Sequence, residues 1–211
     1  MRYFFLIIGF MSVIILSCDK AKVADLQDKI VYVDLTPDLV LHPVDSVGQH
    51  PSGFCYEYIP FPTDSTQNVD LDIDQNGVND FRFTYTTFFQ FVSASNPCTN
   101  YNSTLVVKGL SAENNIRVKN LEMDEVCVLD TGDLIKSNQL FSNNAVIFRD
   151  YASNFLNYDD FAGEGFIGVK FSGGKIAWIK LDFQKNSFTC TIMEYGYNET
   201  KNNQIAVGQK E

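Results

Sequence analysis

The chain has 211 residues, of which 20% are charged, and a net charge of −10 at pH 7. This acidic balance is unfavourable for binding nucleic acid, because phosphate backbones are contacted through basic patches. Aromatic residues make up 14% of the chain, including 18 Phe and 10 Tyr, which favours strands over helices. The length is sufficient for one domain with a sizeable core.

The first residues have the layout of a secretory signal. Arg2 supplies a positive charge, and an apolar run extends from Phe4 to Leu16 before Ser17 and Cys18. Such a run matches the apolar core of a signal peptide and is too short to span a membrane as a helix. Residues 1–17 are therefore predicted to be a signal peptide.

The end of the run resembles a bacterial lipoprotein signal, in which a small residue precedes an invariant cysteine. That resemblance implies cleavage before Cys18 and lipid on its thiol, and two or three acyl chains anchor a protein stably. The alternative is an ordinary signal peptide with a nearby cysteine. Residues 18–28 are predicted to be the lipidated cysteine and a polar tether. The expected partner is a membrane, and the expected location is the cell envelope, with the outer membrane favoured.

Short strands are predicted throughout the rest of the chain. Apolar and polar residues alternate between Gly, Asn, Asp and Pro, and no long helical periodicity follows residue 30. Strands are expected over residues 30–33, 81–86, 115–119, 125–128, 165–171, 176–183 and 188–195, the last three forming a meander. Residues 29–211 are predicted to be a single β-rich domain, either an antiparallel β-sandwich or a jelly-roll-like fold.

The strand over residues 176–183 is expected to divide its side chains between two opposite faces. Its alternation directs one set of side chains to one side, namely Ala177, Ile179, Leu181 and Phe183, and Ile176, Trp178, Lys180 and Asp182 to the other. Trp178 could belong to an aromatic platform for sugars, but core packing is the ordinary fate of such a residue in a sandwich. We expect Trp178 in the core.

Four cysteines remain if Cys18 carries lipid: Cys55, Cys98, Cys127 and Cys190. An even number in an oxidising compartment is compatible with two disulfides, and three pairings are possible. Their wide spacing fits no zinc motif. The alternative role is that of core thiols, because free Cys is among the most buried residue types.

The most specific internal pattern is an acidic loop, Asp72-x-Asp74-x-Asn76-Gly77-x-x-Asp80. Calcium takes six to eight hard oxygen ligands, and alternate residues in a tight turn can direct several carboxylates inward. Gly77 stands where a calcium loop turns sharply. Oxygen ligands are expected from the side chains of Asp72, Asp74, Asn76 and Asp80 and from the Val78 carbonyl.

This loop is not an EF-hand, because Phe83 stands where the bidentate Glu is required and the flanking sequence is strand-like. It is similar to the shorter calcium turns of β-rich secreted proteins. The alternative is a polar hairpin turn without metal, since Asp, Asn and Gly all favour turns. Three neighbouring Asp would then repel one another, so we predict structural Ca²⁺.

Several motifs together resemble a β-rich domain of uncharacterised secreted and lipid-anchored Bacteroidota proteins. They are the acidic loop ending in Asp80-Phe81, Gly132-Asp133-Leu134-Ile135, Gly165-Phe166 through Phe171, Trp178-Ile179-Lys180-Leu181, Tyr195-Gly196-Tyr197 and Ile205 through Gly208. Ile176-Ala177 departs from the family's Tyr-Gly before the Trp. The resemblance implies fold and location and transfers no catalytic residue.

Catalytic patterns are incomplete. Asp130-Thr131-Gly132 spells the aspartic-protease triplet, but that mechanism needs two carboxylates and the chain has no second copy. Glu122 and Asp124 could share a strand face, but Val126 stands where a glucanase motif has its third acid. His42 and His50 lie beside prolines in a predicted loop. No nucleophile elbow or phosphate loop is present, so an enzyme is disfavoured.

Three functions follow for the predicted envelope lipoprotein. The first is a calcium-stabilised surface binding or adhesion module, with glycans or another cell-surface component as the expected ligand. The second is a structural or accessory lipoprotein with no small ligand. The third is a carboxylate-based glycoside hydrolase, which needs paired carboxylates with displaced pKa values in a pocket. A buried Trp178 without another aromatic patch would count against the first.

Overall fold

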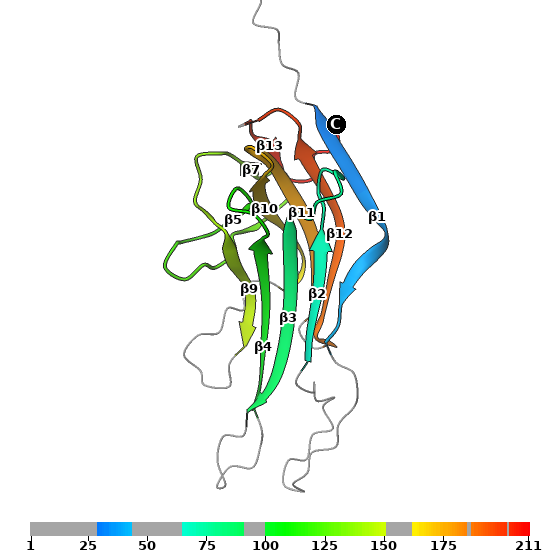
Figure 1. The fold of residues 1–211 in the computed structure, drawn as a ribbon, viewed down its shortest axis with the longest axis vertical. Coiled ribbons are helices and arrows are strands. Elements are labelled where there is room, and N and C mark those ends of the chain that lie inside the picture. Colours follow the sequence, from blue (N-terminus) through cyan, green and yellow to red (C-terminus); the bar gives the residue numbers. More distant parts are fainter. Residues whose placement is uncertain (1–28, 44–64, 91–99, 151–161, 185–186, 202) are drawn as a thin grey trace, which may run out of the picture.

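The computed structural model describes residues 29–43, 65–90, 100–150, 162–184, 187–201 and 203–211. Within these ranges the chain is all-β, as predicted, and contains no α-helix (Figure 1). Two antiparallel sheets face one another as a β-sandwich. The described part of the chain has no helix that is long and apolar enough to cross a membrane.

The larger sheet has the order β1-β12-β11-β10-β5-β8. Its strands are β1 (Ile30–Leu41), β5 (Asn115–Arg117), β8 (Phe141–Ser142), β10 (Gly163–Phe171), β11 (Lys175–Gln184) and β12 (Thr189–Asn198). The short β6 (Val128–Leu129) also pairs with β10. Strands β10, β11 and β12 form the predicted meander, joined in antiparallel register.

The smaller sheet has the order β2-β3-β4-β9. Its strands are β2 (Ser65–Leu71), β3 (Phe81–Gln90), β4 (Asn100–Gly109) and β9 (Asn144–Asp150). A separate two-stranded ribbon pairs β7 (Leu134–Ile135) with β13 (Ile205–Ala206). Strands β2, β3 and β4 follow one another within this sheet and form a second meander. Of the two predicted folds, the structure therefore has the antiparallel β-sandwich.

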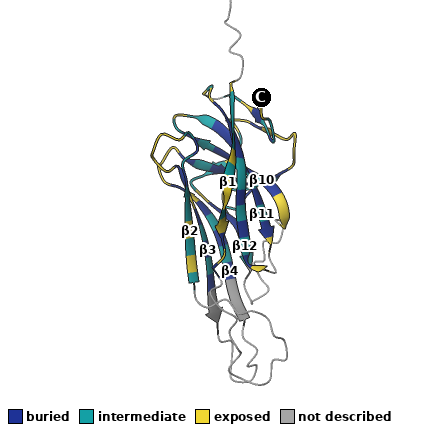
Figure 2. Ribbon diagram, turned by 90° about the vertical axis from the view of Figure 1, so that its right-hand side faces the viewer, coloured by how far each residue is buried: buried dark blue, intermediate teal, exposed yellow. Residues whose placement is uncertain are grey.

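The inner core lies between the two sheets and contains residues from both. Phe81, Phe83 and Tyr85 of β3 are fully buried there against β11 and its neighbours. The four side chains predicted to share one face of β11 all belong to this core: Ala177, Ile179, Leu181 and Phe183. Figure 2 shows the buried residues along both sheets. Period-two alternation therefore divided the side chains of β11 correctly between its two faces.

The opposite side of β11 is also covered, by a second group of apolar residues that we name the outer cluster. Its buried members are Leu129, Ile135, Ile176, Trp178, Ile205 and Val207. The ribbon of β7 and β13 and the residues after it supply most of this cover. Trp178 has no exposed surface, and its indole N–H donates to the backbone oxygen of Gln209 at 3.3 Å. The expectation that Trp178 belongs to the core is confirmed.

Two of the cysteines can be placed. Cys190 lies on β12 in the inner core, where burial, followed by the charge of Asp182, raises its pKa to about 12. Cys127 packs against the outer cluster on the other face of the sheet. Both are free thiols in the structure, so neither takes part in a disulfide, and Cys190 has the predicted alternative role of a core thiol. Cys55 and Cys98 lie outside the described residues, as does Cys18.

One end of the sandwich carries both the acidic loop and the start of the described chain. Ile30, Asn198 and Ile176 are aligned across β1, β12 and β11. The Lys29 ammonium pairs with Glu199 at 2.7 Å just beyond this row. Lys175, next to Ile176, contacts the acidic loop. The described chain therefore begins at the same end of the sandwich as the acidic loop (Figure 1).

Candidate metal centre

The acidic loop connects β2 to β3 through a tight turn that Asp72 organises. One Asp72 carboxylate oxygen accepts from the Gly77 N–H at 2.7 Å and the other from the Asn76 N–H at 3.2 Å. Gly77 has φ = +87°, a conformation that residues with a Cβ rarely adopt. The sequence therefore folds back here because Asp72 caps the turn and Gly77 permits it.

Asp80 closes the loop from the other side and is only 5% exposed. Its carboxylate accepts from the Ile73 N–H at 2.9 Å and from the Asn114 side-chain amide at 3.3 Å. The same amide of Asn114 also donates to the Asp80 backbone oxygen at 2.8 Å. Asn114 is itself buried, so it fixes both the backbone oxygen and the carboxylate of Asp80.

Asp74 is the least satisfied of the three acids. Its side chain is only 7% exposed, and one carboxylate oxygen pairs with the Lys175 ammonium at 3.2 Å. Its other oxygen, Oδ1, is buried and has no hydrogen-bond partner. An unpaired buried carboxylate oxygen is costly, which points to a partner such as a cation.

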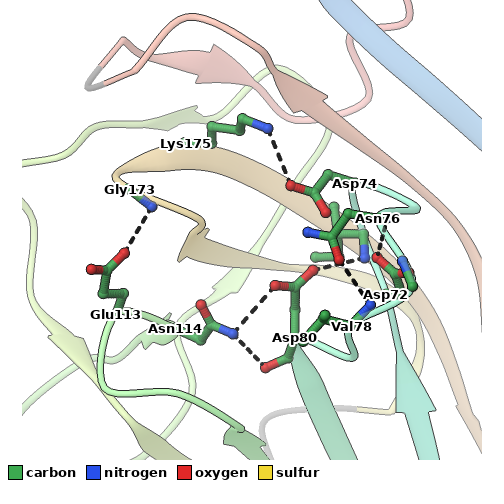
Figure 3. Close-up of polar contacts among 11 residues, drawn as sticks. Asp72, Asp74, Asn76, Val78, Asp80, Glu113, Asn114, Gly173 and Lys175 are labelled. Atoms are coloured by element: carbon green, nitrogen blue, oxygen red, sulfur yellow. Dashed lines mark hydrogen bonds and ion pairs between the residues drawn. The ribbon is translucent and has the colours of Figure 1, made fainter.

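The structure brings the three acids together. Ligand oxygens of Asp72, Asp74 and Asp80 all lie within 4.8 Å of one another, so this triad could hold a metal ion (Figure 3). Burial raises the pKa of Asp80, and the charges of Asp74 and Asp72 raise it further. Without a cation, ionised Asp80 therefore carries a free-energy cost from desolvation and from like charges.

Asn76 and Val78, the other two predicted ligands, lie on the exposed side of the loop. The Asn76 side-chain oxygen accepts from the Val78 N–H at 2.8 Å, so Asn76 stabilises the turn. The Val78 side chain is 67% exposed at the surface of the loop. The acidic side chains that the structure brings together are thus Asp72, Asp74 and Asp80, while the Asn76 side chain and the Val78 carbonyl stay predicted ligands.

Three surrounding residues were not expected from the sequence. Asn114 comes from the loop after β4, Lys175 from the start of β11, and Tyr195 from β12. The Tyr195 hydroxyl donates to the Asp72 backbone oxygen at 3.4 Å and accepts from Gln75 at the same distance. Burial, followed by the charges of the triad, raises the pKa of Tyr195. The larger sheet thereby contacts a loop of the smaller one.

The other patterns weighed in the sequence do not form sites in the described residues. Asp130 and Asp133 stand in a turn in which the Asp133 carboxylate accepts from the Asp130 N–H at 3.0 Å. Asp124 accepts from the Ser142 hydroxyl at 2.7 Å, and Glu122 is exposed. His42 contacts the Thr189 hydroxyl at 3.1 Å, and His50 lies outside the described residues.

The triad offers carboxylate oxygens only, with no thiolate or imidazole. Hard oxygen donors suit Ca²⁺, Mg²⁺ or Mn²⁺, whereas zinc sites are rich in Cys and His. No protein-family model, curated protein or solved structure matches the chain. The chemistry of the site is therefore argued from these donors and their setting.

Proposed function

We propose that the chain is a cell-envelope lipoprotein whose β-sandwich binds Ca²⁺ in the acidic loop, with the ion in a structural role. The observation that carries the metal is the buried Oδ1 of Asp74, which has no hydrogen-bond partner and belongs to a triad of acids. A cation between the carboxylates would supply that partner and remove their mutual repulsion.

Calcium is proposed because the site is built from a loop and is irregular. Ca²⁺ accepts variable geometry and six to eight oxygens, whereas Mg²⁺ requires near-ideal octahedral geometry and retains its waters. The backbone around Asp72 and Gly77 is fixed by hydrogen bonds, while water can complete the coordination sphere on the exposed side of Asn76 and Val78.

A structural role is proposed because the loop lies where the two sheets meet. The triad belongs to the connection between β2 and β3, while Lys175 and Tyr195, which contact it, belong to the larger sheet. An ion bound there would fix one end of the sandwich. This is also the end of the sandwich where the described chain begins, at Lys29.

The described residues favour this structural role over a glycan-binding one. Trp178 is buried, and none of the exposed large apolar side chains in the described ranges is aromatic: Val40, Val78, Leu110, Leu121, Met123, Leu134 and Leu140. A sugar platform needs accessible aromatic faces. A hydrolase is also disfavoured at the triad, because Asp74 and Asp80 are too buried for a sugar to reach both.

Isothermal titration calorimetry tests the metal. We expect the chain from residue 18 onward, with Cys18 replaced by Ser, to bind one Ca²⁺. We expect Mg²⁺ to bind roughly tenfold more weakly. Asp74→Asn should abolish binding, because it removes a ligand charge from the triad. Asp130→Asn, in a turn whose acids are not part of the triad, should bind as the unchanged chain does. Equal Ca²⁺ binding by the Asp74 variant would refute the proposed site.

Membrane fractionation tests the anchor. When the whole chain is expressed in a bacterium with a lipoprotein pathway, we expect it in the membrane fraction with added lipid mass on Cys18. Cys18→Ala should release it or leave the signal uncleaved, because the acyl chains provide the anchor. An unlipidated N-terminus in the unchanged protein would show an ordinary signal peptide. Membership of the Bacteroidota family stays a prediction.

A further inference from the structure

A lysine from the other sheet lies at the edge of the metal centre. The Lys175 ammonium is 3.2 Å from Asp74 Oδ2, although the two residues are 101 positions apart in the chain. Figure 3 shows Lys175 reaching Asp74 from the larger sheet, while the second oxygen of Asp74 lies on the side of the other acids. Asp74 therefore directs one carboxylate oxygen to Lys175 and the other toward the side of Asp72 and Asp80.

The lysine is held in this position by two aromatic rings as well as by Asp74. Its ammonium lies 5.7 Å from the centroid of the Phe171 ring and 5.5 Å from that of the Tyr197 ring. The two rings pack edge to face, with centroids 5.6 Å apart. Cations within about 6 Å of an aromatic centroid are attracted to it. The Lys175 side chain is 21% exposed, so its charge is partly shielded from water.

A fixed positive charge at this place has two opposite effects. It compensates Asp74 when no ion is present, which holds the loop against the larger sheet. It also repels an entering divalent cation and competes with it for Asp74, because calcium affinity depends on the charge count of the ligands. The three acids with Lys175 have a net charge of −2 rather than −3.

We propose that Lys175 is a built-in counter-ion that weakens Ca²⁺ binding and keeps the empty loop closed. This proposal rests on the proposed function, since it assigns the residue that sets the affinity of that same site. A site weakened in this way fills only at a higher calcium concentration than the three acids alone would require.

Lys175→Met is the direct test, because Met keeps an unbranched apolar side chain near the two rings and removes the charge. By titration with Ca²⁺ on the chain from residue 18 onward, we expect its Kd to fall about tenfold. Its melting temperature in chelator should fall as well. A residue that only supports the fold would, when replaced, weaken calcium binding, so the direction of the change is decisive.

Two further variants complete the experiment. Lys180→Met is the matched control, because Lys180 lies on the same strand, is 19% exposed and pairs with Glu164 at 2.8 Å, away from the triad. It should leave the calcium Kd unchanged. Lys175→Arg keeps the charge and should bind within about threefold of the unchanged chain.

The outcomes separate the two proposals. If the unchanged chain binds Ca²⁺ and Lys175→Met binds it equally or more weakly, the counter-ion role is overturned and the metal site stands. If Lys175→Met unfolds, Lys175→Gln removes the charge in its place: a lower Kd than that of the unchanged chain would support the counter-ion role, and an equal or higher Kd would overturn it. If none of the folded proteins binds Ca²⁺, the metal centre itself fails.

Discussion

One millimolar Ca²⁺ is expected to raise the melting temperature of the chain from residue 18 onward by about 5–11 °C over its value in chelator. The reason is that an ion which binds the folded state with a Kd of about 10 μM adds roughly 2.7 kcal/mol at that concentration. The stabilisation arises at the triad, where a cation would remove repulsion and give Asp74 Oδ1 its missing partner. Circular dichroism at the wavelength of strand absorption is the measurement.

Variants isolate the source of this shift. Asp74→Asn also breaks the pair with Lys175, so its melting temperature in chelator will change for a second reason. The quantity to compare is therefore the increment caused by calcium, which should vanish in Asp74→Asn and persist in Asp130→Asn. A calcium increment that survives in the Asp74 variant, or one that Mg²⁺ reproduces in full, would mean that the acidic loop is not the calcium site.

Local patterning predicted several of the strands that contribute to the core. The alternating segments over residues 81–86, 165–171 and 176–183 all lie in observed strands, β3, β10 and β11. Strand β2 was not expected, because an edge strand of sequence Ser-Thr-Gln-Asn-Val-Asp-Leu contains few apolar residues. The segment predicted over 125–128 contributes only Val128 to β6, since Glu125 and Val126 form isolated bridges instead.

The candidate site was only partly predictable, because some of its residues come from distant parts of the chain. Alternate acids within one loop can be read from spacing, and Asp72, Asp74 and Asp80 do meet. The residues that fix and neutralise them, Asn114 and Lys175, are 34 positions from Asp80 and 101 from Asp74. Their contacts depend on how two sheets are stacked, and the pattern within each strand does not determine this.

The way in which both faces of β11 are buried could not be predicted from the sequence pattern. Alternation placed Trp178 on the face opposite Ala177 and Ile179, and core packing was expected for it, but the segments that cover this face were not predicted. The structure covers that side with β7, β13 and the residues that follow. Tyr32 and Lys210 add a polar edge, with the Lys210 ammonium 4.0 Å from the centroid of the Tyr32 ring. The C-terminal residues thus complete the fold by packing on the larger sheet.

Trp178→Ala is expected to lower the free energy of unfolding by about 3–5 kcal/mol, because it removes the largest side chain of the outer cluster. The indole packs edge to face on Phe166, with centroids 5.6 Å apart, and close to Gly196, where an added Cβ would lie 2.7 Å from the ring. The substitution also removes the indole N–H that donates to the Gln209 backbone oxygen. Urea unfolding followed by circular dichroism is the measurement.

Val40→Ala is the control for this loss, since Val40 is on β1 but 52% exposed, and it should change stability by at most about 0.5 kcal/mol. If Trp178→Ala folds, its melting temperature should still rise with calcium. The reason is that the indole belongs to the outer cluster, whereas the triad belongs to the loop between β2 and β3. A loss below about 1 kcal/mol would mean that the C-terminal residues do not pack on Trp178. Trp178 would then be an accessible aromatic surface, which would restore glycan binding as the leading function.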